Sequence, residues 1–206
     1  YQYYGNKKIL EIFYDNMKRW IDFMWQHSKG YIWNYMLQFG DWLALDAAEG
    51  SYFGATPNDL TCTAYFAYST GIFRKAEEAL GKEEDSRIYG QLYQDICNAF
   101  CSHFLKLDGM LRINTQTALA MALHFGLLPK EHVQKNAEEL RWRIRENGDH
   151  MTTGFMGTPC ILAALSENGF TEDAYRLFLR EEYPSWLYQV KKGATTVWEH
   201  LDGMKS

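Results

Sequence analysis

The sequence predicts an all-α protein. Apolar side chains recur at three- and four-residue spacing through most of the chain, which is the stripe of an amphipathic helix. Residues 7–27 show this spacing on one face, with Leu10, Phe13, Met17, Trp20 and Met24. Glycines and Asn-Gly pairs interrupt the pattern at short intervals. Successive helices therefore have short connections, and we expect them to form antiparallel pairs.

Seven helices are expected, with limits set by caps and breakers. The first covers 7–27 and is ended by Ser28-Lys29-Gly30. Asn58 or Asp59 is expected to cap the second, which runs to Leu80 before Gly81. The other five are expected over about 82–105, 115–125, 129–146, 158–167 and 171–180.

Two all-α architectures fit antiparallel helix pairs: an α/α toroid and a solenoid of repeated pairs. No self-similarity appears at periods of roughly 34, 40 or 47 residues, which argues against the solenoid. A toroid places its site in loops at one end of a ring of inner helices, here 31–57, 109–114, 148–157 and 181–203. The length of 206 residues suits one domain spanning 1–206.

Composition and charge argue against several kinds of binding partner. The net charge of −5 gives no electrostatic basis for binding nucleic acid or an anionic membrane. No apolar run approaches the ~20 residues of a membrane helix. The spacing of the four cysteines does not fit a zinc site, and we interpret them as small apolar residues rather than disulfides. No metal or cofactor is expected, and the compartment, cytoplasmic or exported, stays open.

The segment 181–203 contains the strongest candidate for chemistry. Pro184 excludes a helix through its own position, and residues 195–198 are β-formers, so we expect an irregular or short extended segment. Glu199 follows Trp198 directly, among several other aromatic residues. A carboxylate beside aromatic rings suits a sugar-cleaving site, in which rings stack on the sugar and the carboxyl acts as acid or base. The alternative is a surface glutamate in a loop.

Two further segments hold candidate binding residues. Asp41-Trp42, in FGDWL, is a second acid–aromatic pair, which would offer a sugar platform and a carboxylate for hydroxyl groups. The alternative is a short helical turn capped by Asp41, with Trp42 in the core. His150, in DHMTTGFMGTP, is a candidate ligand contact, although a lone histidine is more often structural.

Taken together, these motifs resemble the bacterial α-L-rhamnosidases of glycoside hydrolase family 78, over about residues 4–203. The matching stretches are YGNKKILEIFYDNMKRWIDF, FGDWL, TQTALAMALHFGLLP, HMTTGFMGTP and ALSENGFTEDAYRLFLREEYPSWLYQVKKGATTVWEHLDG. The resemblance implies an (α/α)6 barrel and the hydrolysis of terminal α-L-rhamnose with inversion. It also implies that Glu199 is the general base and that Trp42 lines the rhamnose subsite. Asp41, Trp198 and His150 fall in matching motifs as substrate contacts.

The resemblance also implies that part of the site is missing. The family's general acid belongs to an acidic and arginine-rich segment upstream, which nothing in 1–206 matches, and His200 stands where members often have Arg. A six-hairpin ring needs twelve helices. We therefore expect a C-terminal piece of a catalytic domain, inactive alone. Its exposed face would be covered by the missing N-terminal part of its own domain or by a homodimer.

Other functions stay open beside this one. A different toroid enzyme, such as a glucosidase or an uronate-processing enzyme, would share the helical architecture. An uronate enzyme should carry several basic residues in the site loops, and the late loop offers Arg180, Lys191 and Lys192. A helical sugar-binding module without catalysis is the third hypothesis.

Overall fold

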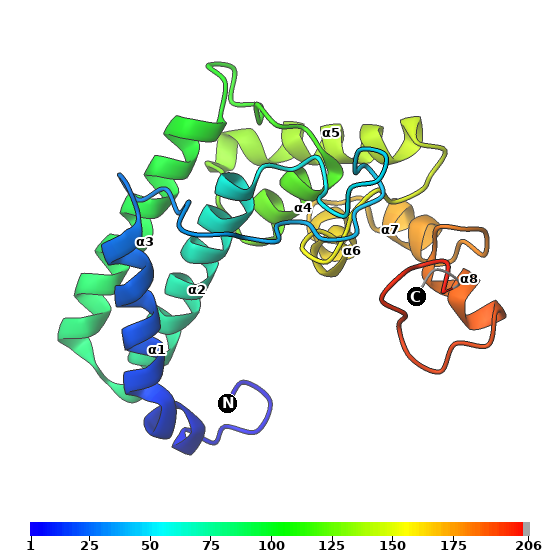
Figure 1. Cartoon of the computed structure of the whole chain (residues 1–206). Coiled ribbons are helices and arrows are strands. Elements are labelled where there is room, and N and C mark those ends of the chain that lie inside the picture. Colours follow the sequence, from blue (N-terminus) through cyan, green and yellow to red (C-terminus); the bar gives the residue numbers. More distant parts are fainter. Residues whose placement is uncertain (204–206) are drawn as a thin grey trace.

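The computed structural model describes residues 1–203, and within that range the chain is helical without strands. Eight helices follow one another (Figure 1): α1 (Lys8–His27), α2 (Asn58–Leu80), α3 (Glu83–Phe104), α4 (Gln116–His124), α5 (Lys130–Glu146), α6 (Thr158–Ser166), α7 (Thr171–Phe178) and α8 (Trp186–Lys191).

The helices pack as sequential hairpins. α2 packs on α3, α4 on α5 and α6 on α7, and the turns inside these pairs are the short stretches 81–82, 125–129 and 167–170. α1 packs on α2, and α4 packs on α6 beside it (Figure 1). The arrangement is part of a helical toroid. Because helices alternate in direction, the long connections 28–57, 105–115, 147–157 and 179–203 belong to the end opposite the short turns.

α4 is the central helix of the core. Its residues from Gln116 to Leu123 are all buried, as expected for a helix that is apolar on every side. Thr115 caps it, because its hydroxyl oxygen accepts a hydrogen bond from the Ala118 N–H at 3.2 Å. The buried start of α4 holds Gln116 and Thr117 at the end of the molecule where the long connections lie.

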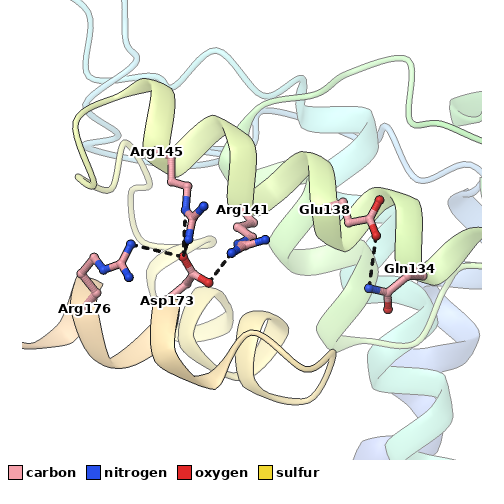
Figure 2. A network of polar contacts seen from close by, with 6 residues as sticks. All are labelled: Gln134, Glu138, Arg141, Arg145, Asp173 and Arg176. Atoms are coloured by element: carbon pink, nitrogen blue, oxygen red, sulfur yellow. Dashed lines mark hydrogen bonds and ion pairs between the residues drawn. The ribbon is translucent and has the colours of Figure 1, made fainter.

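A cluster of charges ties α7 to α5 on the outer wall (Figure 2). Asp173, near the start of α7, is buried, and its carboxylate lies 2.9 Å from Arg141 Nε and 2.7 Å from an Arg145 terminal nitrogen, both from α5. Arg176, one turn along α7, lies 3.7 Å away. Three guanidinium groups thus surround one carboxylate at the junction of two hairpins.

All seven expected helices are confirmed, with limits within two residues of those predicted. Two details are wrong. The N-cap of α2 is Pro57, with no side-chain cap, and Asn58 is already helical. The segment 181–203 contains α8, which starts directly after the buried Ser185 because that hydroxyl accepts from the Tyr188 N–H at 3.1 Å. Residues 195–198 form no strand.

The four cysteines are free thiols, with Cys160 buried and the others half-buried. Within residues 1–203, no helix has the length and apolar character needed to cross a membrane. The same range contains no cluster of three or more His, Cys, Asp or Glu side chains suited to a metal ion.

Candidate functional site

Hydrogen bonds join three of the long connections into one surface. The Leu45 N–H donates to the Thr152 carbonyl at 2.9 Å, and the Phe155 N–H donates to the Trp42 carbonyl at 3.0 Å. Thr56 and Thr115 share a hydroxyl–hydroxyl bond of 2.6 Å. Connection 28–57 is therefore bonded to both 105–115 and 147–157, as the toroid interpretation expects of site loops.

Asp41 lies at the centre of these contacts. One carboxylate oxygen accepts hydrogen bonds from the Gly154 N–H at 2.9 Å and from the Thr117 hydroxyl. The other oxygen accepts from the Met156 N–H at 2.8 Å and the Gly157 N–H at 3.2 Å. Only 1% of Asp41 is exposed. The carboxylate therefore links connection 28–57 to the turn 154–157 and to the start of α4.

Two glycines allow this close approach. A Cβ at Gly154 would lie 2.3 Å from the Trp42 carbonyl oxygen and 2.6 Å from the Ala44 nitrogen. A Cβ at Gly157 would lie 2.3 Å from the Thr117 hydroxyl oxygen. Both positions need a hydrogen in place of a side chain, because the backbone of 42–44 occupies the space at Gly154 and the side chains of Thr117 and Thr153 occupy it at Gly157.

Burial and the charge of Asp41 raise the pKa values of two neighbouring groups, Cys160 and Asp46. Burial first, and then the charge of Asp41, raise the pKa of the Cys160 thiol to about 12, so this cysteine is not a thiolate nucleophile at neutral pH. Burial also raises the pKa of Asp46, although the Ala55 N–H, which donates to it at 3.0 Å, acts in the opposite direction. The charge of Asp41 raises the pKa of Asp46 further.

Trp42 is half-buried within an aromatic group. Its ring centroid lies 5.2 Å from that of Tyr52, and Phe39 and Phe53 meet it edge-on at 5.4 and 5.2 Å. These distances are those of favourable ring pairs, so the neighbours hold the indole in one orientation. Phe39, Tyr52 and Phe53 are themselves exposed, which gives this end of the molecule an aromatic surface.

Glu199 borders a cavity of about 510 Å³ beside this surface. Connection 147–157 and α6 form one wall, the region from Phe178 to Trp186 forms a second, and the late segment closes it. The main lining residues are Leu43, Gly154, Phe155, Leu162, Phe178, Trp186, Val197, Trp198 and Glu199. Among the described lining residues Glu199 is the one carboxylate, so an otherwise mostly apolar cavity has one charged group.

α8 positions the backbone next to Glu199. Gln189, buried on α8, accepts hydrogen bonds from the Trp198 N–H at 3.2 Å and, through its carbonyl, from the Ala194 N–H at 3.0 Å. The Trp198 ring lies against Gly203, where a Cβ would come within 2.0 Å of it. Glu199 itself is exposed and thus accessible to water.

The structure brings some predicted site residues together and separates others. Glu199 and Trp198 line the cavity, and Trp42 adjoins it through its bond to Phe155. Asp41 lies behind the cavity wall, with both oxygens occupied within the protein. Within the described residues, His150 is not among those lining the cavity; its Nδ1 lies 3.3 Å from the Asn147 carbonyl oxygen of its own turn.

Sequence reasoning missed several residues of the site. Thr117 is an ordinary-looking threonine in a buried helix, and nothing local to it signals a bond to Asp41. Phe155 follows Gly154, which stays close to the backbone of another connection, and the glycines at 154 and 157 are a usable signal for such a close approach. Phe178 and Trp186 approach each other, with ring centroids 5.8 Å apart, only because α7 and α8 fold back.

Sequential helix pairs with long connections at one end, and an aromatic cavity with one carboxylate there, define a helical toroid with its candidate site in the loops at one end. The chain belongs to the family described as the bacterial alpha-L-rhamnosidase 6 hairpin glycosidase domain, whose model matches residues 1–206. The resemblance in the sequence is thereby confirmed.

Similar proteins agree with this family. The chain is 38% identical to an alpha-L-rhamnosidase of Formosa agariphila over 95% of its length, and 38% identical to one of an Alteromonas species over 97%. It spans about a fifth of the length of these curated relatives, 21% and 22%.

Solved structures share the fold. The alpha-L-rhamnosidase of Streptomyces avermitilis, in complex with L-rhamnose, superposes with a TM-score of 0.90 at 33% identity, covering 99% of this chain and 19% of that one. The enzyme of Aspergillus terreus gives 0.89 at 31% identity, covering 98% and 24%.

Proposed function

We propose that the chain forms part of the catalytic domain of an inverting α-L-rhamnosidase and that Glu199 is its general base. The observation that carries the proposal is the position of Glu199: an exposed carboxylate at the edge of an aromatic cavity, in the family's hairpin domain. The substrate is a terminal, non-reducing α-L-rhamnose in an oligosaccharide or glycoside.

The reaction balances with two carboxyl groups. Glu199 takes a proton from water while the water oxygen bonds to the anomeric carbon, on the face opposite the leaving group. The bond from that carbon to the aglycone oxygen breaks, and a second carboxyl donates a proton to the departing oxygen. Inverting enzymes place the two carboxyls roughly 6.5–9.5 Å apart, which leaves room for the water. We propose that this second carboxyl comes from chain outside residues 1–206.

Aromatic side chains hold the sugar in this proposal. Trp42, fixed by its ring neighbours, is the platform for the apolar face of the rhamnose ring, and Trp198 contributes a second ring beside the base. His150 stays a predicted contact, although its bond to Asn147 and its place away from the cavity favour a structural role. Asp41 acts on the site indirectly, through the backbone that it holds.

Removing the base tests the proposal. In the whole protein that contains this chain, Glu199→Gln should lower kcat on an aryl α-L-rhamnoside by roughly 10³-fold, within the range of general base catalysis. The matched control is Glu182→Gln, an exposed glutamate of the same region that pairs with Arg180 at 3.6 Å and should leave kcat unchanged. A Glu199→Gln variant with full kcat would refute the assignment.

Two measurements separate the proposal from its alternatives. L-Rhamnose should raise the melting temperature of the whole protein, whereas D-glucuronate should not; the reverse would favour an uronate-processing enzyme. The rhamnose first released, observed by NMR, should have the anomeric configuration opposite to that of the substrate. Residues 1–206 alone should not hydrolyse the aryl rhamnoside, and turnover by this piece would show that it contains the acid.

A further inference from the structure

We propose that Asp41 is a positioning residue: it sets the wall of the Glu199 cavity through the backbone of residues 154–157 and does not touch the sugar. The inference rests on the proposed function for its effect on rhamnoside binding. Its structural part, that one buried carboxylate holds this wall in place, stands on the geometry alone.

The carboxylate of Asp41 is fully used inside the protein. A carboxylate offers about four acceptor sites, and here four donors occupy both oxygens: the N–H groups of Gly154, Met156 and Gly157 and the hydroxyl of Thr117. With 1% of the residue exposed, neither oxygen is accessible to a substrate hydroxyl.

The groups that Asp41 holds are parts of the cavity. Gly154 lines the cavity directly, and Phe155, the next residue, presents its ring there. The Phe155 N–H donates to the carbonyl of Trp42, which follows Asp41 in the sequence. One carboxylate thereby fixes two neighbouring segments: the turn that forms the wall facing the Glu199 segment, and the strip of backbone that presents the Trp42 ring.

Asp41 also acts as a cap for α6. The N-cap residue of that helix, Gly157, has no side chain to cap it, and the N–H groups of Met156 and Gly157, directly before α6, donate to Asp41. A negative charge at a helix N-terminus is favoured by the helix dipole. Thr158 and Pro159, in the first turn of α6, line the cavity, so its register follows the position of Asp41.

A carboxylate is needed here because all four partners donate. An asparagine at position 41 would present one acceptor oxygen and one NH2 group, and the NH2 would face N–H groups that cannot accept. Asp41→Asn has almost the same shape, so it changes the hydrogen bonds and little else. The turn 154–157 would then shift or lose its fixed position.

The test compares two buried carboxylates in the whole protein. Asp41→Asn should raise KM for the aryl rhamnoside and the inhibition constant of L-rhamnose together by roughly tenfold, equivalent to about 1.4 kcal/mol. A parallel rise with kcat changed less than about threefold is the signature of lost ground-state binding. Asp173→Asn removes an equally structural carboxylate on the outer wall and should lower the melting temperature while leaving KM and the inhibition constant unchanged.

Milder variants keep the inference testable if Asp41→Asn fails to fold. Thr117→Val removes one of the four donors with little change in shape, and it should raise KM and the inhibition constant in the same direction by a smaller factor. Thr117→Ser keeps the hydroxyl and should restore the parent values. A Thr117→Val variant that loses thermal stability but keeps both constants would overturn the positioning role.

Hydrogen exchange separates this inference from the proposed function. In Asp41→Asn the amides of Gly154, Met156 and Gly157 should exchange faster than in the parent, whether or not the protein hydrolyses rhamnosides. Unchanged exchange at these amides would refute the structural step. Faster exchange with unchanged rhamnose inhibition would refute the link to binding. No activity in the parent, with faster exchange in the variant, would refute the proposed function alone.

Discussion

Asp41 and Asp173 are both buried aspartates, but they are held in opposite ways. Asp41 accepts hydrogen bonds from three backbone N–H groups and one hydroxyl, all uncharged. Asp173 is surrounded by the guanidinium groups of three arginines, each partly exposed to solvent (Figure 2). The first lies at the end of the molecule with the cavity, and the second lies on the outer wall.

The difference shows what each region requires. Arginines reach Asp173 on long, flexible side chains, so the cluster joins α5 to α7 without fixing the backbone to small tolerances. Backbone donors do not adapt in that way. The contacts of Asp41 therefore fix the path of the backbone itself. A binding site needs this precision, whereas the outer wall around Asp173 does not. Salt should weaken the Asp173 cluster more, because its partners are partly exposed.

A large effect on stability is expected for the outer wall. Asp173→Asn should lower the free energy of unfolding by about 3 kcal/mol, the low end for breaking a buried ion pair, because the three arginines lose their common partner but keep contact with water. Thermal or urea unfolding of the whole protein measures it. A loss below about 0.5 kcal/mol would place this cluster with ordinary surface ion pairs.

A smaller effect, confined to binding, is expected at the cavity end. Trp42→Ala should raise KM for an aryl rhamnoside by roughly tenfold, since one aromatic contact contributes on the order of 1–2 kcal/mol. The matched control is Trp142→Ala on α5. This tryptophan is 48% exposed, and the guanidinium group of Arg143 lies over its ring. If both variants raise KM equally, the contrast between the two regions fails.

A third buried carboxyl, Glu77 of α2, is held in yet another way, because within residues 1–203 its oxygens have no hydrogen-bond partner. Burial first, and then the charge of Asp85 on α3, raise its pKa from 4.5 to about 7, although the charge of Lys18 on α1 opposes this. The folded state thus holds a proton that the unfolded state releases, and stability should fall as pH rises from about 4.5 to about 7.

Glu77→Gln should remove this dependence. The melting temperature of the variant relative to the parent should increase between pH 5 and pH 8 in the whole protein, because glutamine stays neutral. Glu78→Gln, next in sequence but exposed and paired with Arg74 at 3.1 Å, is the control and should show no such trend. A difference that decreases with pH would show that the folded state favours the charged form of Glu77.

The helices were predictable because their signals are local. Gly81 and Gly126 end helices with positive φ, and apolar periodicity marks the helical faces between them. α8 was not predicted because Pro184 and the β-formers at 195–198 restrict only the backbone at their own positions. The helix that starts after Ser185 lies between them and is too short to give a periodic apolar pattern. Sequence order also predicted that the long connections share one end.

The roles within the site were harder to predict, because they depend on contacts between distant segments. Asp41 and Gly154 are separated by more than a hundred positions, and only the fold shows that the carboxylate points into protein. Glu199 could be singled out because its aromatic neighbours are adjacent in sequence. Thr117 could not be singled out, because it lies in α4 and its partner, Asp41, lies far away in the sequence, in connection 28–57. Local pattern finds a candidate carboxylate more readily than the groups that hold a site in place.

The division between long and short connections has a practical consequence. The turns at 81–82, 125–129 and 167–170 lie at the end away from the cavity, and the space around Gly81, Gly126 and Gly169 is open. A reactive handle inserted in one of these turns would attach the protein to a solid support with the cavity mouth facing the liquid. The fold thus has a built-in orientation for immobilisation, with the face that bears the cavity free and the hairpin turns bound.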